Sequence, residues 1–301
     1  MIAELATCPL PAEIRIAAPE PSAAEAALDV ILRPLQPLRE QFTAITGLGL
    51  DVELPDDRGV RRIVRPSEGG SLAYLAAGQP AAQRVLLLHG SPGLAEEWAP
   101  FLTEVPEGQY RIAVDRPGFG DSGQDTAVVD LGAQARAVAP LLPSQDGPGA
   151  VLVGYSYGGP VALRLAADYP AQVAAVVLIG AAADPALEET HPLQQIAALE
   201  FFEALLPVEL AHANAELLAL RAELEDLAVD LPGIGAPVTM LQGLADTLVP
   251  PANIEYLRAR LTAPLRIVMI DEADHFLPWT HVPLIEAALT CAAQDAADQS
   301  R

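Results

Sequence analysis

A single serine lies between glycines in the stretch VLVGYSYGGP, residues 151–160. Gly154 precedes Ser156 by two positions and Gly158 follows it by two, so neither flank carries a Cβ that would obstruct a sharp turn from strand to helix. Such a turn would hold the Ser156 hydroxyl clear of a sheet, where it could attack a carbonyl carbon. Because a lone G-x-S-x-G occurs by chance in unrelated chains, this interpretation needs partners elsewhere in the sequence.

The first partner required is a histidine, because a serine hydroxyl attacks a carbonyl only if a base accepts its proton. His191 and His212 fall in helical stretches, and His281 falls in what we expect to be the last helix. His275 instead follows directly on the apolar run LRIVMID, although a histidine near the C-terminus is often an ordinary surface residue. We predict that His275 is the base.

The second partner is an acid that orients the base. Asp246, in QGLADTLVP, follows the apolar run 236–243, and the next apolar run, 265–271, leads to His275. Asp184, after the run ending IGAA, is the competing acid. An aspartate at a strand end can instead cap a helix. The chain order of Ser156, Asp246 and His275 is nevertheless the order expected with this type of turn, so we predict these three residues as a catalytic triad.

An attacked carbonyl becomes an oxyanion, which needs hydrogen-bond donors already in place. The backbone N–H of Tyr157, at the start of the helix after the serine, is one candidate. The backbone N–H of Ser91, in the tight loop HGSPG at 89–93, is the other. We expect His89 to brace this loop through hydrogen bonds and to take no part in the chemistry.

The elements that must position these residues are six runs rich in Val, Ile and Leu. The runs lack polar alternation, which is typical of parallel strands covered on both faces. They are 84–90, 110–115, 150–156, 173–180, 236–243 and 265–271. Helix-compatible stretches separate most of them, and GVRRIVRP and SLAYLAAG resemble two antiparallel edge strands. The pattern predicts an α/β fold with a mostly parallel sheet flanked by helices.

The alternation is interrupted at 184–235, which is strongly helical and contains no strand candidate. We expect a small helical cap over the strand ends, with an insertion that does not contact substrate as the alternative. Phe201 and Phe202 are candidate walls of a substrate pocket, and Trp98 could belong to the pocket or to the core. The predicted organisation is an Ala/Pro-rich helical appendage at 1–59, a core at 60–183 and 236–301, and the cap between the two core segments.

The formal net charge is −23, which excludes nucleic acid and anionic membrane surfaces as favoured partners because a polyanion would be repelled. Cys8 and Cys291 show neither metal-ligand spacing nor a paired framework, so we expect either a reducing compartment or cysteines without a specific role, and no structural disulfide. We find no signal peptide and no apolar run long enough to span a membrane. The expected location is the cytoplasm, and an oligomer is left open.

In combination these motifs resemble the α/β-hydrolase superfamily over about residues 60–292. The motifs that carry the resemblance are HGSPG followed by Trp98, DRPGFGDS at 115–122, GYSYGG at 154–159 and the segments around Asp246 and His275. The resemblance implies an eight-stranded, mostly parallel sheet with the cap inserted after the sixth strand. It also implies that the DRPGFGDS loop is structural.

Departures from related patterns narrow the expected reaction. Haloalkane dehalogenases and epoxide hydrolases of similar outline use an aspartate where this chain has Ser156. Proline iminopeptidases resemble the chain in HGSPG, but they usually carry a tryptophan where Tyr157 stands; Glu200, Glu203 and Glu209 keep that alternative open.

We therefore expect a carboxylesterase-like serine hydrolase that cleaves esters, or related lactones or thioesters, through an acyl-enzyme on Ser156. Its partner would be a small-molecule ester, and the motifs imply no metal and no organic cofactor. The alternatives are a proline-iminopeptidase-like peptidase and a noncatalytic small-molecule-binding protein on the same scaffold.

Overall fold

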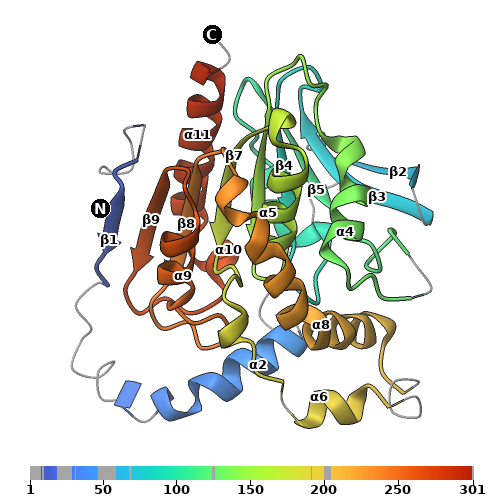
Figure 1. Ribbon diagram of the computed structural model, residues 1–301, viewed down its shortest axis with the longest axis vertical. Coiled ribbons are helices and arrows are strands. Elements are labelled where there is room, and N and C mark those ends of the chain that lie inside the picture. The colour runs from blue at the N-terminus through green and yellow to red at the C-terminus, as the bar shows by residue number, and fades with distance from the viewer. Residues whose placement is uncertain are drawn as a thin grey trace.

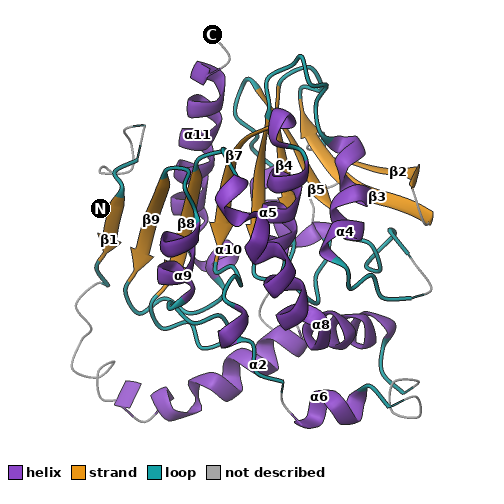
Figure 2. Cartoon of the chain, in the orientation of Figure 1, coloured by secondary structure: helices purple, strands orange, loops and turns teal. Residues whose placement is uncertain are grey.

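The structure, a computed structural model, describes residues 8, 10–18, 29–30, 32–46, 59–67, 70–123, 126–190, 192–199 and 205–299. Its centre is one nine-stranded sheet in the order β1-β9-β8-β7-β6-β4-β5-β3-β2 (Figures 1 and 2). The strands are β1 Glu13–Ile16, β2 Arg61–Ser67, β3 Gly70–Gly78, β4 Gln83–Leu88, β5 Gln109–Val114, β6 Ala150–Tyr155, β7 Val173–Ile179, β8 Val238–Gly243 and β9 Leu265–Ile270.

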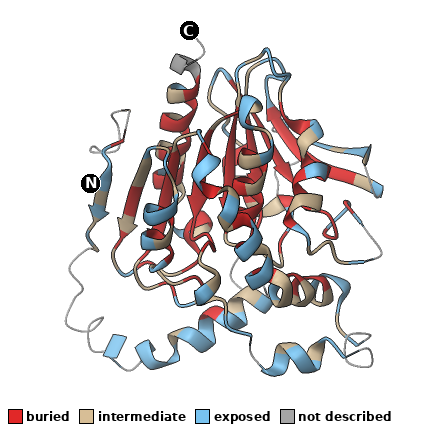
Figure 3. Ribbon diagram, viewed as in Figure 1, coloured by how far each residue is buried: buried red, intermediate tan, exposed pale blue. Residues whose placement is uncertain are grey.

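The predicted α/β-hydrolase-type fold is confirmed. Strands β4 to β9 pair in parallel, whereas β3 pairs antiparallel with both β2 and β5, as expected for the edge strands. Every residue of β5, β6 and β8 is buried, because helices cover both faces of the sheet (Figure 3). Unbroken apolar runs therefore became the central strands.

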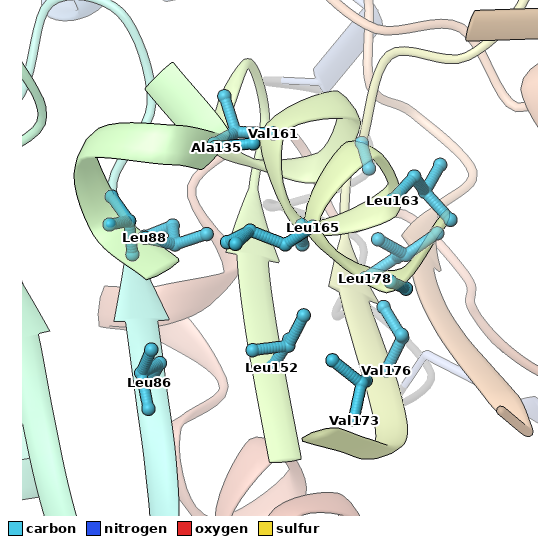
Figure 4. Packing of buried hydrophobic residues seen from close by; sticks show 14 of the residues in the cluster. Leu86, Leu88, Ala135, Leu152, Val161, Leu163, Leu165, Val173, Val176 and Leu178 are labelled. Carbon is cyan, nitrogen blue, oxygen red and sulfur yellow. The ribbon is translucent and has the colours of Figure 1, made fainter. Parts of the chain in front are cut away.

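Two apolar clusters, one on each face, hold the helices against the sheet. The helices with α-helical geometry are α2 Gln36–Thr46, α3 Ala99–Leu102, α4 Leu131–Val138, α5 Gly158–Asp168, α6 Pro192–Ala197, α8 Val208–Asp230, α9 Asn253–Arg260, α10 Leu277–Thr280 and α11 Val282–Gln299. One cluster joins α4, α5, α8 and α9 to the sheet, and Figure 4 shows the part beneath α4 and α5. The other joins α3 and α11 to the opposite face.

The N-terminal segment corrects two expectations. The sheet has nine strands where eight were expected, because β1, from the predicted appendage, pairs in parallel with β9 (Figure 1). Cys8 and Cys291 form a disulfide that ties this segment to α11, where we expected no structural disulfide. Spacing could not reveal the bond, because its partners lie 283 residues apart and meet only once β1 is in the sheet.

Between β7 and β8 the described chain is helical, with α6, α8 and two short 3-10 helices, Pro185–Leu187 and Leu231–Gly233. This insertion follows the sixth of the eight strands β2 to β9. Helix α6 and the start of α8 lie at the end of the molecule where the strands finish (Figure 1). Within the described residues, every helix is too short or too polar to span a bilayer.

Candidate active site

Ser156 stands on a sharp turn between β6 and α5. Its φ of +52° lies in the left-handed region, which costs a non-glycine residue free energy and is typical of functional turns. A Cβ on Gly154 would lie 2.4 Å from the Gly158 carbonyl oxygen, and a Cβ on Gly158 would lie 2.2 Å from the Leu88 carbonyl oxygen. Both flanking glycines are therefore required by close backbone approach, as the sequence indicated.

Asp246 and His275 are hydrogen-bonded to each other. His275 Nδ1 lies 2.8 Å from Asp246 Oδ2, and both residues are 4% exposed. The other carboxylate oxygen, Oδ1, accepts from the backbone N–H groups of Leu248 at 3.0 Å and Val249 at 2.8 Å. Because an ionised carboxylate only accepts, Nδ1 carries the imidazole proton in this pair and Nε2 is left with its lone pair.

The turn bearing Ser156 and the Asp246–His275 pair meet at Gly180. The Ser156 N–H donates to the Ile179 carbonyl at 3.0 Å, and the next residue, Gly180, has a φ of +48°. A Cβ on Gly180 would lie 3.3 Å from both Asp246 Oδ2 and His275 Nδ1. The three residues predicted as a triad therefore lie at one edge of the sheet.

The competing residues lie elsewhere or have other partners. Asp184 accepts a hydrogen bond from the N–H of Ala186 and caps the following 3-10 helix, so it acts locally. His212 Nδ1 lies 2.7 Å from the Gly118 carbonyl oxygen, and His191 lies outside the described residues.

The loop at 89–93 lies against the serine turn. A Cβ on Gly90 would lie 3.1 Å from the Ser156 Cβ, and the Ser91–Pro92 peptide bond is cis. Tyr157 is the N-cap of α5, so its N–H is one of the amides at the helix start that no preceding turn satisfies. Both predicted oxyanion donors thus belong to segments that flank Ser156.

His89 braces this loop, as expected. Its Nε2 accepts a hydrogen bond from the Arg116 backbone N–H at 2.9 Å, so its Nδ1–H donates to the Gly90 carbonyl at 2.7 Å. Burial, and then the nearby Arg116 charge, lower the pKa of His89 well below its usual value. The imidazole is therefore neutral and structural.

A buried ion pair, which the sequence analysis missed, joins helix α8 to the core. Glu216 of α8 and Arg116 are both fully buried; Arg116 Nη1 lies 2.6 Å from Glu216 Oε1 and Nη2 lies 3.0 Å from Oε2. Gln134 Nε2 donates to Oε1 at 2.7 Å, and the Ser91 hydroxyl donates to Oε2 at 2.5 Å. The Arg116 guanidinium also lies 4.7 Å from the centre of the Tyr157 ring. One carboxylate of the insertion thus contacts the loop that carries Ser91.

Tyr155 packs against His275 and lies near several acidic residues. The Tyr155 ring lies 5.0 Å from the His275 ring at a tilt of 34°. Burial, followed by the charges of Glu97, Asp246 and Asp274, raises the pKa of Tyr155 well above its usual value. The phenol is therefore neutral and packs against one side of the imidazole.

Glu97 is an enclosed carboxyl group on the loop that follows HGSPG. Part of its side chain reaches solvent, but its Oε1 accepts a hydrogen bond from the Leu94 N–H at 3.3 Å, and a Cβ on Gly93 would lie 3.0 Å from it. Burial raises the pKa of Glu97 to about 8.

The predicted pocket residues are only partly placed. Trp98 is 1% exposed and packs edge-on against Phe101 in the apolar core, which favours the core among its two possible roles. Phe201 and Phe202 lie outside the described residues. A cavity of about 430 Å³ lies between α8 and α9. Its lining does not include Ser156, Asp246 or His275, so we do not assign it to this site.

Comparison with known proteins gives consistent matches. Residues 85–291 match the family model described as "Alpha/beta hydrolase family". The chain is 32% identical, over 54% of its length, to the dihydrolipoyllysine-residue acetyltransferase component of an acetoin cleaving system from Cupriavidus necator, and this match spans only 44% of that relative. It is 28% identical to a pimeloyl-acyl-carrier-protein methyl ester esterase of Neisseria meningitidis, covering 65% of this chain and 72% of the esterase.

Solved structures match over more of the chain. A membrane phospholipase A, described as a bacterial virulence factor, is 25% identical with a TM-score of 0.59, covering 92% of this chain and 96% of that one. The epoxide hydrolase CorEH has a TM-score of 0.64 at 17% identity, covering 78% and 99%, a likeness of fold alone.

Proposed function

Because the chain belongs to the alpha/beta hydrolase family, we propose that it is a serine hydrolase of the carboxylesterase type. Ser156 is the nucleophile, His275 the general base and Asp246 the acid that orients the imidazole. One observation carries the proposal: His275 is hydrogen-bonded to Asp246 at the same sheet edge where Ser156 is held at φ +52°.

The acylation step follows from the tautomer of His275. Ser156 Oγ attacks the ester carbonyl carbon while its proton passes to His275 Nε2, the nitrogen that the bond to Asp246 leaves free. The C–O bond to the alcohol then breaks, the proton on Nε2 passes to the alcohol oxygen, and the acyl group remains on Ser156. Asp246 stabilises the imidazolium and stays ionised.

Deacylation repeats these steps with water in place of serine. Water attacks the acyl carbon and gives its proton to His275 Nε2, the bond from the carbon to Ser156 Oγ breaks, and the proton returns to Oγ. The carboxylic acid leaves and the enzyme is restored.

The negative oxygen formed in both halves of the reaction would be stabilised by the backbone N–H groups of Ser91 and Tyr157. Each such donor contributes roughly 3 kcal/mol to the stability of the transition state. The Ser91 hydroxyl donates to Glu216, which is paired with Arg116, so this buried pair holds the loop that carries the Ser91 N–H in position.

The substrate class proposed is carboxylic esters, or related lactones or thioesters. The Neisseria relative is named as a methyl ester esterase and the solved relative as a phospholipase A, which supports this choice. The serine at position 156 separates the chain from the haloalkane dehalogenases and epoxide hydrolases of similar outline, in which an aspartate takes that place.

We also propose that 184–235 act as a cap over this site. Two residues of α8, Glu216 and His212, reach the loops at 89–93 and 115–122, which supports contact between the insertion and the site. For location we favour an oxidising compartment over the cytoplasm, because disulfides such as Cys8–Cys291 persist where thiols are not kept reduced.

The direct assay is hydrolysis of p-nitrophenyl esters of graded acyl-chain length. Ser156→Ala should lower turnover by several orders of magnitude and leave the fold intact. Ser144→Ala, at an exposed serine, is the matched control and should keep full activity. Hydrolysis that survives in Ser156→Ala would exclude this serine as the nucleophile, and a folded wild-type protein that cleaves no ester would favour a noncatalytic binding role.

A further inference from the structure

Helix α2, in the N-terminal segment, is oriented against the usual amphipathic pattern. Its glutamate Glu40 is 0% exposed, whereas Leu38 and Ile45 on the same helix are 66% and 59% exposed. A carboxylate is costly to bury unless hydrogen bonds satisfy it. The hydrogen bonds of Glu40 therefore hold this helix against the protein, because Leu38 and Ile45 remain exposed.

Those contacts reach a single loop. Glu40 Oε2 accepts hydrogen bonds from the backbone N–H of Thr247 at 3.0 Å and from its hydroxyl at 2.7 Å. Gln36, one helical turn earlier, donates through Nε2 to Glu40 Oε1 at 2.7 Å and to the Ala245 carbonyl at 2.7 Å. Gln36 and Glu40 thus hydrogen-bond the loop at two residues, Ala245 and Thr247.

The residue between these two positions is Asp246. The Asp246 carboxylate is held by His275 and by the N–H groups of Leu248 and Val249. Helix α2 holds the residues on either side of Asp246. Helix α2 also reaches the neighbouring loop, where Arg39 Nη2 lies 3.3 Å from Asp274 Oδ2, one residue before His275. One helix therefore spans the loops that carry both members of the pair.

Described residues that precede α2 in the chain are held to the same side of the sheet. Strand β1 pairs with β9, the strand that leads into the His275 loop, and Arg15 of β1 lies 2.6 Å from Asp271 at the end of that strand. The disulfide at Cys8 adds a covalent tie. Cys8, strand β1 and helix α2 all precede the 85–291 stretch that matches the family model, and their partners on β9, at Asp271 and at Cys291 lie within it.

We propose that Glu40 is a positioning residue for the active site: it fixes the loop of Asp246 and, through Asp246, the orientation of the His275 imidazole. The inference rests on the proposed function for its consequence in turnover. The Glu40 carboxylate is also among the charges that raise the pKa of Tyr155, which packs on His275, so it lies in the same electrostatic environment.

Loss of Glu40 would leave the Thr247 N–H without its acceptor and free the loop to shift. Because displacement of a reacting group by about 1 Å can cost a factor of about 100 in rate, we expect Glu40→Ala to lower kcat by about 10- to 100-fold. KM for a small ester should change by less than about twofold, because the hydrogen bonds of Glu40 go to Gln36 and Thr247 and the expected effect is on the orientation of the triad.

The test compares three variants with the wild-type full-length protein. Glu40→Ala removes the hydrogen bonds to Thr247. Glu40→Gln keeps one oxygen that can accept from Thr247, so its kcat should lie between those of Glu40→Ala and the wild type. Leu38→Ala, at an exposed position of the same helix, is the matched control and should behave as wild type. Thermal unfolding confirms that each variant is folded at the assay temperature. If Glu40→Ala does not fold, Gln36→Ala, which removes the contact to Ala245, carries the same test.

A second readout is independent of turnover. The proton between His275 Nδ1 and Asp246 should give a downfield signal in ¹H NMR, assigned by its loss in His275→Gln. We expect this signal to broaden or disappear in Glu40→Ala and to persist in Leu38→Ala.

A folded Glu40→Ala protein with unchanged kcat and an intact signal would overturn the inference, as would an equal fall in Leu38→Ala. If the wild-type protein hydrolyses no ester, the proposed function fails, and the NMR signal alone decides whether Glu40 positions His275.

Discussion

Removal of the buried Glu216 carboxylate should destabilise the protein far more than removal of an exposed one. In the native state this carboxylate accepts four hydrogen bonds, two from Arg116 and one each from Gln134 and Ser91. Glu216→Ala would leave the Arg116 guanidinium fully buried with neutral acceptors only, namely Gln134 Oε1 and two backbone carbonyls.

The expected magnitude follows from burial. Breaking a buried ion pair by removing one partner costs about 3–5 kcal/mol, because an uncompensated charge stays buried. The exposed pair Arg33–Asp29 gives the matched control: Asp29→Ala should lower the free energy of unfolding by about 0–1 kcal/mol.

Urea unfolding followed by fluorescence measures both changes. A double replacement, Arg116→Met with Glu216→Met, should recover much of the stability, because no charge is left buried. Turnover should be lower than in the wild type in both Glu216→Ala and the double variant, because the Ser91 hydroxyl has lost its acceptor and the loop at 89–93 is held less firmly. A Glu216→Ala protein within about 1 kcal/mol of wild type would show that the buried pair contributes no more to stability than a surface pair does.

Three further predictions concern the acid, the disulfide and a titrating carboxyl group. Asp246→Asn should lower kcat by about 10⁴-fold, because an amide cannot hold the required imidazole tautomer, and Asp184→Asn should keep most activity; the reverse result in an ester assay would reassign the acid. Replacing Cys8 and Cys291 by serine should lower the free energy of unfolding by about 5.6 kcal/mol, from a loop of 283 residues in the chain-entropy treatment, and equal urea midpoints with and without reductant would contradict it. Because the folded-state pKa of Glu97 is raised from 4.5 to about 8, its neutral form contributes stability that is full below pH 4.5 and is lost as pH rises to about 8. Glu97→Gln should flatten that part of the Tm–pH curve, and an unchanged slope would exclude this carboxyl as its source.

The centre of the fold could be predicted because its determinants are local. Unbroken apolar runs such as 150–156 predict buried parallel strands, and the glycines around Ser156 predict the turn. Each of these patterns lies within a few residues. Parallel strands end at one edge of a sheet, so residues that follow them meet there. The placement of Asp246 beside His275 needed no further information.

The support around the site could not be predicted because its determinants are distant partners. Strand β1 is four residues long with a mixed pattern, EIRI, and it is a strand only because β9 lies beside it. Glu40 and Glu216 look like ordinary helix-surface acids in the sequence. Their burial depends on Thr247 and Arg116, which lie 207 and 100 residues away.

The proposed reaction depends on Ser156 being a nucleophile that His275 activates. A fluorophosphonate probe tests it directly, because the probe reacts with activated serines and the adduct is located by mass spectrometry of peptides. We predict one adduct per chain, on the peptide that carries Ser156, and its loss in His275→Ala while Ser144→Ala is labelled normally. A folded wild-type protein that takes up no probe, or a His275→Ala protein that is labelled at Ser156 as well as the wild type, would exclude this mechanism.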